Sequence, residues 1–248
     1  MEWTIEDRCD GKNGPLSYVT YEDGSPIAEE TDIDLLLDHL EWRITTEILR
    51  NLGHYVQLHA AGLVTEKRAL LLVGPSGAGK SSLALSLLLQ GWKCLSDEVI
   101  LVDAESPSVW PFPRSFRVGF KTLSLFPGLG TGQACADMGK RRLDPALVLD
   151  SWATGPSMPG WIIFPNYHPS HQGDLIPLGE TEALTLLLGQ AINLVDHGKK
   201  GLDILTQLVR HFRCFRLNTG DLNVATSVLV RLTKQGHGAP CASDAVHK

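Results

Sequence analysis

Apolar residues recur at helical spacing in the first third of the chain. The segment opens with Thr31-Asp32, a residue pair suited to capping a helix, and ends at Gly53. Between these signals the apolar positions are three or four residues apart, as on one face of an amphipathic helix. The pattern predicts a helix built on Ile33, Leu36, Leu37, Leu40, Ile44, Ile48 and Leu49.

Shorter patterns on either side of this helix predict strands. Residues 16–27 alternate and turn at Asp23-Gly24, which indicates a small hairpin. After the helix, residues 55–64 and 69–73 are apolar runs separated by a polar turn, as expected of core strands.

The second of these runs leads into a glycine-rich segment and then into another helical pattern. Residues 82–90 have helical spacing and stop at Gly91. Residues 92–95 and 99–102 follow as strands. A strand, a glycine loop and a helix in this order predict an α/β fold.

The rest of the chain contains loops and further helices. Prolines at 107–113 and glycines at 127–133 predict loops around short elements. With no internal repeat and no long linker, we expect one domain over 1–235, in which 1–30 form N-terminal strands and 236–248 follow as a disordered tail. The other predicted elements are a buried strand at 161–164 and helices at 181–195, 201–212 and 222–234.

Composition narrows the functional classes. The chain has 248 residues, 43% of them hydrophobic and 20% charged, and a net charge of -6, which disfavours a general nucleic-acid binder. No signal peptide and no apolar run of membrane-spanning length is present in the sequence, so we expect a cytoplasmic protein. Zinc and disulfide frameworks are not indicated, because no C-x-x-C pair occurs among Cys9, Cys94, Cys135, Cys214 and Cys241.

Residues 74–81 read GPSGAGKS, a complete Walker A phosphate-binding loop (P-loop) in its strand-loop-helix context. The glycines allow backbone N–H groups to approach phosphate oxygens, and the following helix directs its N-terminal amides at the same place. Lys80 would bridge the β- and γ-phosphates, and the Ser81 hydroxyl would bind Mg²⁺. The predicted ATP-binding residues are Gly74, Pro75, Ser76, Gly77, Ala78, Gly79, Lys80, Ser81 and Ser82.

An acidic pair follows this loop, and a histidine precedes it. Asp97 and Glu98 come directly after a strand-like run, where a carboxylate could hold Mg²⁺ with Ser81 and a second could orient the attacking hydroxyl. A solvated strand end is the simpler alternative. His59 lies on the strand before the loop, although a lone histidine between Leu58 and Ala60 is more often a satisfied core residue.

These segments together resemble the HPr kinase/phosphorylase superfamily. The resemblance is carried by LHAAG, GPSGAGKSSLAL, GWKCLSDEVILV and PFPRSFRVGFKTL, and it extends from the first long helix to the last. It implies a mixed sheet flanked by helices, similar to the HPr kinase C-terminal domain and the phosphoenolpyruvate carboxykinase core. In that family a histidine precedes the phosphate loop and an acidic pair follows it, which favours a functional His59.

The resemblance also implies a reaction. Its members transfer the ATP γ-phosphoryl group to a serine of a protein or peptide, and the smaller members include lasso-peptide tailoring kinases, so a C-terminal precursor-peptide serine is a candidate acceptor. Asp97 would be the general base assisted by His59, with Glu98 sharing base or Mg²⁺ duty. The larger enzymes carry Asp-Asp here, an extra N-terminal domain and a glycine-arginine signature, which this chain lacks. Homo-oligomers are common in the superfamily.

Basic residues suggest further contacts. In PRSFRVGFK, Arg114 and Lys121 match a family pattern and would neutralise the transferring phosphoryl group, whereas Arg117 alternates away from them. The run 140–142 would suit an acidic peptide, although such runs are more often surface. We expect His168 and His171 to lie in a loop.

Other functions remain open on the sequence. A phosphate-loop NTPase switch would use the same loop with water as acceptor, although the N-K-x-D element typical of guanine specificity is absent. HPr kinase itself, a small-molecule kinase and a silent nucleotide-binding module are further alternatives. The presence of Lys80, Ser81 and the acidic pair disfavours the last.

Overall fold

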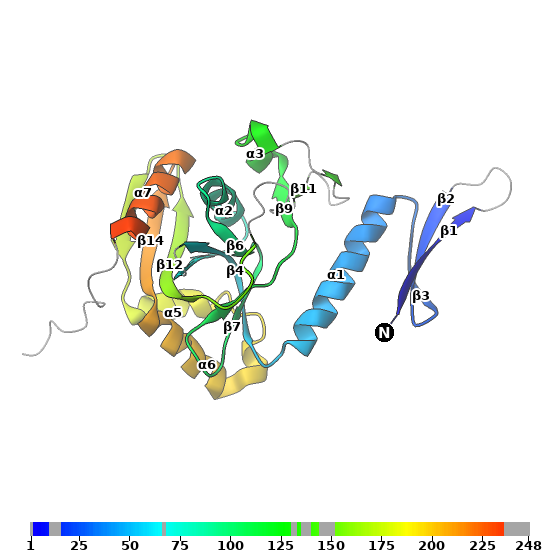
Figure 1. Ribbon diagram of the computed structural model, residues 1–248, viewed down its shortest axis with the longest axis horizontal. Coiled ribbons are helices and arrows are strands. Elements are labelled where there is room, and N and C mark those ends of the chain that lie inside the picture. Colours follow the sequence, from blue (N-terminus) through cyan, green and yellow to red (C-terminus); the bar gives the residue numbers. More distant parts are fainter. Residues whose placement is uncertain are drawn as a thin grey trace, which may run out of the picture. The chain divides into compact units, whose positions relative to one another are not determined.

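The computed structural model describes residues 2–9, 16–65, 68–129, 133–134, 140–143 and 152–235 (Figure 1). The chain divides into two compact units, Met1–Leu52 with Arg117–Leu143, and Gly53–Phe116 with Asp144–Lys248. Each unit is described by itself, and the expectation of one domain stays a prediction. The predicted tail, 236–248, lies outside the described residues.

An antiparallel meander opens the first unit. Strands β1 (Trp3–Cys9), β2 (Leu16–Glu22) and β3 (Ser25–Glu30) are hydrogen-bonded in that order. The predicted hairpin is confirmed: Asp23 and Gly24 have φ of 48° and 78°, and positive φ at both central residues is typical of a tight hairpin turn.

Helix α1 (Ile33–Asn51) follows, as its apolar spacing predicts. The Asp32 side chain accepts a hydrogen bond of 2.8 Å from the Asp34 N–H, which satisfies one of the free amides of the first turn. The unit also contains a small sheet of β9 (Phe116–Gly119), β10 (Gln133–Ala134) and β11 (Lys140–Leu143), with α3 (Phe120–Leu123) and the 3₁₀ turn η1 (Pro127–Leu129).

A cluster of four charged residues joins α1 to this small sheet. Asp38, with a side chain 9% exposed, accepts hydrogen bonds from Arg142 and, at 3.3 Å, from Arg117. Glu41 lies 3.2 Å from Arg142 and 3.6 Å from Arg117. Arg117 and Arg142 thus serve an internal ion cluster. The side chains of the other two residues in the run 140–142 lie outside the described atoms.

The second unit is built on one eight-stranded mixed sheet. Its path runs β13-β14-β12-β5-β4-β7-β8, and β6 pairs with β4 beside this path. The β12 strand is parallel to both β14 and β5, whereas β4 is antiparallel to β5, β6 and β7. The strands are β4 (Val56–Thr65), β5 (Arg68–Val73), β6 (Lys93–Ser96), β7 (Val99–Val102), β8 (Val109–Trp110), β12 (Met158–Tyr167), β13 (Gln172–Pro177) and β14 (Arg213–Thr219).

Helices cover both faces of this sheet (Figure 1). Helices α2 (Lys80–Leu88) and α7 (Leu222–Gln235) share one face and are joined by a 2.7 Å hydrogen bond between the Ser86 and Thr226 hydroxyls. Helices α5 (Glu180–Leu188) and α6 (Leu194–His211) cover the other. The predicted mixed sheet flanked by helices is therefore present.

The prediction of one helix over 181–195 was wrong at its C-terminal end. Helix α5 stops at Leu188 with Gly189 as its C-cap, and α6 begins only at Leu194. The intervening backbone instead serves the sheet, because Gln190 O accepts from the His59 N–H at 2.8 Å. Apolar spacing alone does not reveal such an interruption.

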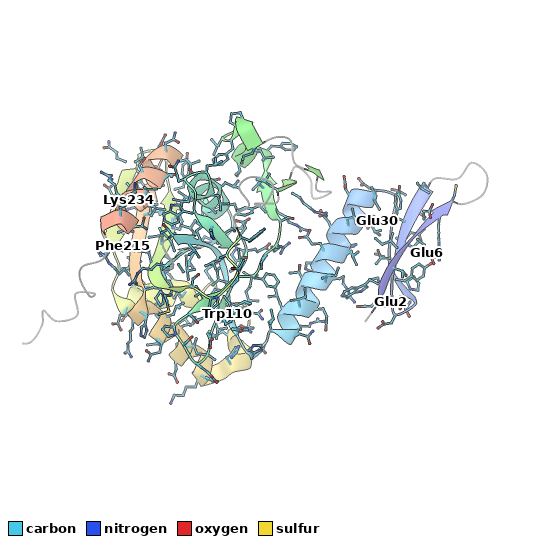
Figure 2. All side chains as sticks on the ribbon, viewed as in Figure 1. Glu2, Glu6, Glu30, Trp110, Phe215 and Lys234 are labelled. Carbon is cyan, nitrogen blue, oxygen red and sulfur yellow. The ribbon has the colours of Figure 1, made fainter. Side chains whose placement is uncertain are left out.

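Alternation of the strands divides the core into two layers. The α5/α6 face is lined by alternate residues of the central strands, such as Leu71, Ile162 and Phe164. Side chains fill the space between the sheet and its helices (Figure 2). Packing is tight at Gly62 on β4, where an added Cβ would lie 2.4 Å from Ile100 Cδ1. No helix among the described residues is long and apolar enough to cross a membrane.

The chain leaves β5 and β12, two adjacent parallel strands, in opposite directions. After β5 it passes through α2 to β6, on the β4 side of the sheet. After β12 it passes through β13, α5 and α6 to β14, on the other side. Such a reversal between neighbouring strands leaves a crevice at their carboxyl ends, which is where open α/β sheets bind ligands.

Candidate functional site

The glycine loop, residues 74–79, follows β5 at this edge of the sheet. Gly77 and Gly79 have φ of +83° and +92°, a region that side-chain-bearing residues rarely adopt. Gly74 is needed for a different reason, because an added Cβ would lie 3.3 Å from the Ala78 Cβ. The Ala78 N–H donates to Pro75 O at 3.2 Å and closes the turn. The loop conformation thus requires its glycines.

Helix α2 begins where this loop ends. Its N-cap, Gly79, has no side chain, so no side-chain hydrogen bond satisfies the first amides of the helix. Free amides and the positive end of the helix dipole at a helix N-terminus favour an anion. Pro75, Ser76 and Gly77 are exposed at the tip of the loop.

Lys80, the first residue of α2, folds back onto the loop. Its Nζ donates to Gly74 O at 2.6 Å and to Pro75 O at 3.1 Å. Burial lowers the pKa of Lys80, and the carboxylates of Asp97 and Glu98 oppose that shift. The ammonium therefore lies in the field of the acidic pair.

The structure brings Asp97 to the start of α2. Ser81 Oγ donates to Asp97 Oδ2 at 3.2 Å, although the two residues are 16 positions apart in sequence. Burial raises the pKa of Asp97 to about 8, and the charge of Glu98 adds to this. The Ser81 hydrogen bond and the charges of Lys80 and Arg114 act in the opposite direction.

One carboxylate oxygen of this aspartate has no hydrogen-bond partner in the described part of the chain. Asp97 Oδ1 is buried and unpaired. Mg²⁺ typically uses one or two protein oxygens and takes its other ligands from water and substrate phosphates. Asp97 with the Ser81 hydroxyl fits that requirement. Within the described ranges, no group of three or more His, Cys, Asp or Glu residues could hold a metal ion. An ion that also binds the phosphates of a nucleotide does not need such a group.

Glu98 points to a different partner. Its Oε2 lies 2.9 Å from Arg114 Nη1, and the Glu98 side chain is 45% exposed while that of Arg114 is 12% exposed. The acidic pair is therefore divided, with Asp97 directed inward at Ser81 and Glu98 outward at Arg114. The predicted Mg²⁺ role of Glu98 stays a prediction.

Ser96 sets up this division, and the sequence reading missed it. Its Oγ accepts hydrogen bonds from the N–H groups of Glu98, at 3.3 Å, and Val99, at 3.2 Å. These bonds form the turn between β6 and β7 that carries both acids. A serine just before an acidic pair at a strand end is a signal for such a turn.

His59 lies on β4, directly opposite Val99 of β7 in the sheet register. Burial and the charge of Lys80 lower its pKa, while Glu98 raises it. The charges of Lys80 and Glu98 thus both act on the imidazole ring. In the part of the chain that the structure describes, it makes no hydrogen bond to either acid of the pair, so its assistance to Asp97 stays a prediction.

The remaining predicted residues belong to α3, to a loop and to α2. Lys121 is exposed on α3 in the first unit, and its predicted role at the phosphoryl group is untested. His168 and His171 lie in the predicted loop, between β12 and β13. Ser82 is half-buried on α2. A cavity of about 360 Å³ between the turn after β7 and helix α6 contains none of the predicted residues.

Comparison with known proteins found similarity to solved structures alone. No family model matches the chain, and no curated protein matches it. Among solved structures, the chain is similar to the HPr(Ser) kinase/phosphatase from Coxiella burnetii, with 16% identity and a TM-score of 0.33, over 73% of this chain and 99% of that one. At that identity and TM-score the similarity by itself assigns neither an activity nor a substrate.

Proposed function

We propose that this protein is a Mg²⁺- and ATP-dependent kinase that phosphorylates a serine hydroxyl of a peptide or protein. The observation that carries the proposal is the 3.2 Å hydrogen bond from Ser81 to Asp97, made at the N-terminus of a helix that follows a glycine loop. It joins a phosphate-binding element to a carboxylate on a neighbouring strand end, as phosphoryl transfer requires.

The phosphates would bind at the glycine loop. The N-terminus of α2 has no side-chain cap and its dipole favours negative charge, and the Lys80 ammonium donates to two carbonyl oxygens of the loop. With nucleotide bound, the Lys80 ammonium would exchange these carbonyls for β- and γ-phosphate oxygens. In this proposal the loop acts as a P-loop.

Ser81 and Asp97 would hold Mg²⁺. The ion, when bound, supplies positive charge against the β- and γ-phosphate oxygens. The unpaired Oδ1 of Asp97 gives this site a free ligand atom in the buried interior. Positive charge near Asp97 would also lower its pKa and keep its carboxylate ionised.

Transfer then needs an acceptor on the Asp97 and Glu98 side of the γ-phosphate. The serine oxygen bonds to the γ-phosphorus as the bond to the β–γ bridging oxygen breaks, and the serine proton passes to a carboxylate. Asp97 is our choice for that carboxylate, because it lies beside Ser81 at the start of α2 and a bound cation would keep it ionised and able to accept the proton. Arg114, held by Glu98 at 2.9 Å, would neutralise charge on the transferring group.

Lys121 and His59 have secondary roles in this proposal. Lys121 would add positive charge at the acceptor side, and His59 would orient a carboxylate. Among acceptors, the serine of a lasso precursor peptide is preferred over HPr, since the chain has Asp97-Glu98 where the larger bifunctional enzymes carry Asp-Asp. A nucleotide-hydrolysing switch is the competing function for the same residues.

The test is a phosphorylation assay with a defined panel of acceptors. The protein is incubated with MgATP and serine-terminated lasso precursor peptides, HPr, or buffer alone, and products are followed by mass spectrometry. Phosphoserine on a peptide, lost in Lys80→Ala and Asp97→Ala but kept in the exposed-lysine control Lys93→Ala, would support the kinase. ADP released at an equal rate without acceptor, and no phosphorylated product, would favour the hydrolase instead.

A further inference from the structure

The acidic pair lies on one side of the glycine loop, which leaves the other side for the rest of the nucleotide. Asp97 and Glu98 follow β6, and β6 and His59 belong to the β4 side of β5. In phosphoryl transfer the attacking and leaving oxygens are roughly in line with phosphorus. An acceptor at the acidic pair therefore requires the leaving ADP to extend away from it, toward β12 and β14.

The chain reverses direction there, and open α/β sheets bind ligands at such reversals. Strand β12 is the other neighbour of β5, and the chain leaves these two strands on opposite sides of the sheet. In the register of the pair Ile163 lies beside Leu72, which continues to place Pro165 beside Gly74. Adjacent strands are about 4.8 Å apart, so the end of β12 flanks the glycine loop.

Tyr167 ends β12 and is 60% exposed. At about 3.3 Å per residue, it extends roughly 7 Å beyond the level of Pro165 and Gly74. Its position gives an unburied aromatic ring at the edge of the crevice.

The alternation of β12 gives the face on which Tyr167 lies. Ile162 and Phe164 belong to the core layer beneath α5 and α6, so odd-numbered residues of β12 lie on the α2/α7 face. Thr219, beside Tyr167 in the register, confirms this, because its hydroxyl donates at 2.8 Å to Asp221 O at the start of α7. Tyr167 therefore shares the face of α2 and its glycine loop.

We propose that Tyr167 is the stacking platform for the nucleobase of the nucleotide whose phosphates occupy the glycine loop. The inference rests on the proposed function and adds a specificity-determining residue to it. An aromatic ring binds any base through its π-face, so this contact selects a nucleoside over a bare polyphosphate. Base identity would depend on other contacts.

A neighbouring residue provides a matched control. Asn166 precedes Tyr167, is likewise exposed, and donates from Nδ2 to Asn218 Oδ1 at 2.8 Å. By alternation it lies on the opposite, α5/α6 face. Changing it tests whether any substitution at the end of β12 disturbs the crevice.

The experiment compares two ligands that differ only in having a nucleoside. Affinities of the full chain for MgATP and for magnesium tripolyphosphate are measured by calorimetry in wild type, Tyr167→Leu, Tyr167→Phe and Asn166→Ala. We expect Tyr167→Leu to weaken MgATP about tenfold and to leave tripolyphosphate unchanged. Tyr167→Phe should restore most of the ATP affinity, and Asn166→Ala should match wild type.

The outcomes separate the two proposals. If wild type binds neither ligand, the proposed function fails and this inference fails with it. If wild type binds both and Tyr167→Leu retains full ATP affinity, or weakens both ligands equally, the stacking role is wrong while nucleotide binding stands. An equal loss of ATP affinity in Asn166→Ala would likewise contradict a contact specific to Tyr167.

Discussion

Ser81 and Asp97 are joined by a 3.2 Å hydrogen bond that links the start of α2 to the end of β6. The serine comes from the glycine-loop segment and the aspartate from a different strand end. Because Asp97 is buried, its carboxylate needs a hydrogen-bond donor, and the Ser81 hydroxyl is one. This bond locates the chemistry proposed for the protein, and several expectations follow from its surroundings.

Lys80→Ala should abolish nucleotide use without unfolding the protein. The change removes a cation from the loop, and losing one preorganised charge contact typically costs on the order of 10²–10³ in kcat. Steady-state phosphorylation and circular dichroism would be measured together. Lys93→Ala, at an exposed strand position, is the matched control. Equal activity in both variants would remove Lys80 from the site.

Asp97→Asn should stabilise the free protein, and more so as pH rises. The folded-state pKa of Asp97 is raised to about 8, so the neutral acid is favoured in the folded protein. Its stabilising contribution is fully present below the unfolded pKa of about 3.9 and is lost as pH rises through about 8. Tm measured in chelator from pH 4 to 9 should show a widening gap between Asp97→Asn and wild type.

Ser81→Ala provides a second check on that curve. The Ser81 hydrogen bond lowers the pKa of Asp97, so its removal should move the pH window upward when the Asp97 carboxyl is present. No upward movement is expected in the double variant with Asp97→Asn. A gap that stays constant with pH would show that Asp97 is not the titrating group.

The two acids should differ in kinetic effect. Asp97→Asn removes the proposed base, which is worth about 10²–10⁴ in rate, whereas Glu98→Gln mainly releases Arg114. We expect a loss of less than about tenfold in kcat for Glu98→Gln, since that pair is partly exposed. Single-turnover rates would decide. A larger loss in Glu98→Gln would transfer the base role to Glu98.

The ion cluster of the first unit should make a large contribution to its stability. Asp38 has a side chain that is only 9% exposed and contacts Arg117 and Arg142. Asp38→Asn leaves two half-buried arginines with Glu41 as their remaining acidic partner among the described residues, and removing one partner from such a charged group typically costs about 1–3 kcal/mol of unfolding free energy. Chemical denaturation would measure it. The control is Glu47→Gln, in a pair with Arg50 that is 72% exposed, where less than about 1 kcal/mol is expected.

Gly62→Ala should destabilise the second unit by about 1–3 kcal/mol through overpacking. An added Cβ would meet Ile100 Cδ1 at 2.4 Å and Leu95 Cβ at 3.2 Å. Gly155→Ala is the comparison, since nothing lies within 4 Å of its Cβ position. Denaturation midpoints that fall equally in both would contradict the packing argument.

Local patterns in the sequence predicted much of the second unit. The helix predicted at 222–234 is α7, Leu222–Gln235, and the strand predicted at 99–102 is β7, Val99–Val102. Helical spacing followed by Gly236 indicated the helix, and a short apolar run between Glu98 and Asp103 indicated the strand. The strand expected at 161–164 is longer, Met158–Tyr167, because parallel pairing on both edges supports residues that carry no apolar signal.

Strands whose partners lie far away in sequence were missed. β14, Arg213–Thr219, directly follows a helix, and polar residues interrupt its apolar ones, so no strand was predicted there. Pairing between distant segments, rather than intrinsic preference, decides such strands.

The candidate site was predictable where its residues are contiguous in sequence and not where they come together from distant segments. The glycine loop and Lys80 are contiguous and follow from one motif. The division of Asp97 and Glu98 between Ser81 and Arg114 depends on the Ser96 turn and on side-chain directions that spacing does not give.

The contacts of Lys80 bear on nucleotide affinity. Its ammonium donates to Gly74 O and Pro75 O. In the proposed function, a nucleotide would replace these two carbonyl oxygens as the partners of the lysine. Nucleotide binding would thus exchange one set of hydrogen bonds for another, and the net binding free energy from Lys80 would be the difference between the two sets. Such an exchange would make the net affinity for a nucleotide lower than its contacts alone suggest.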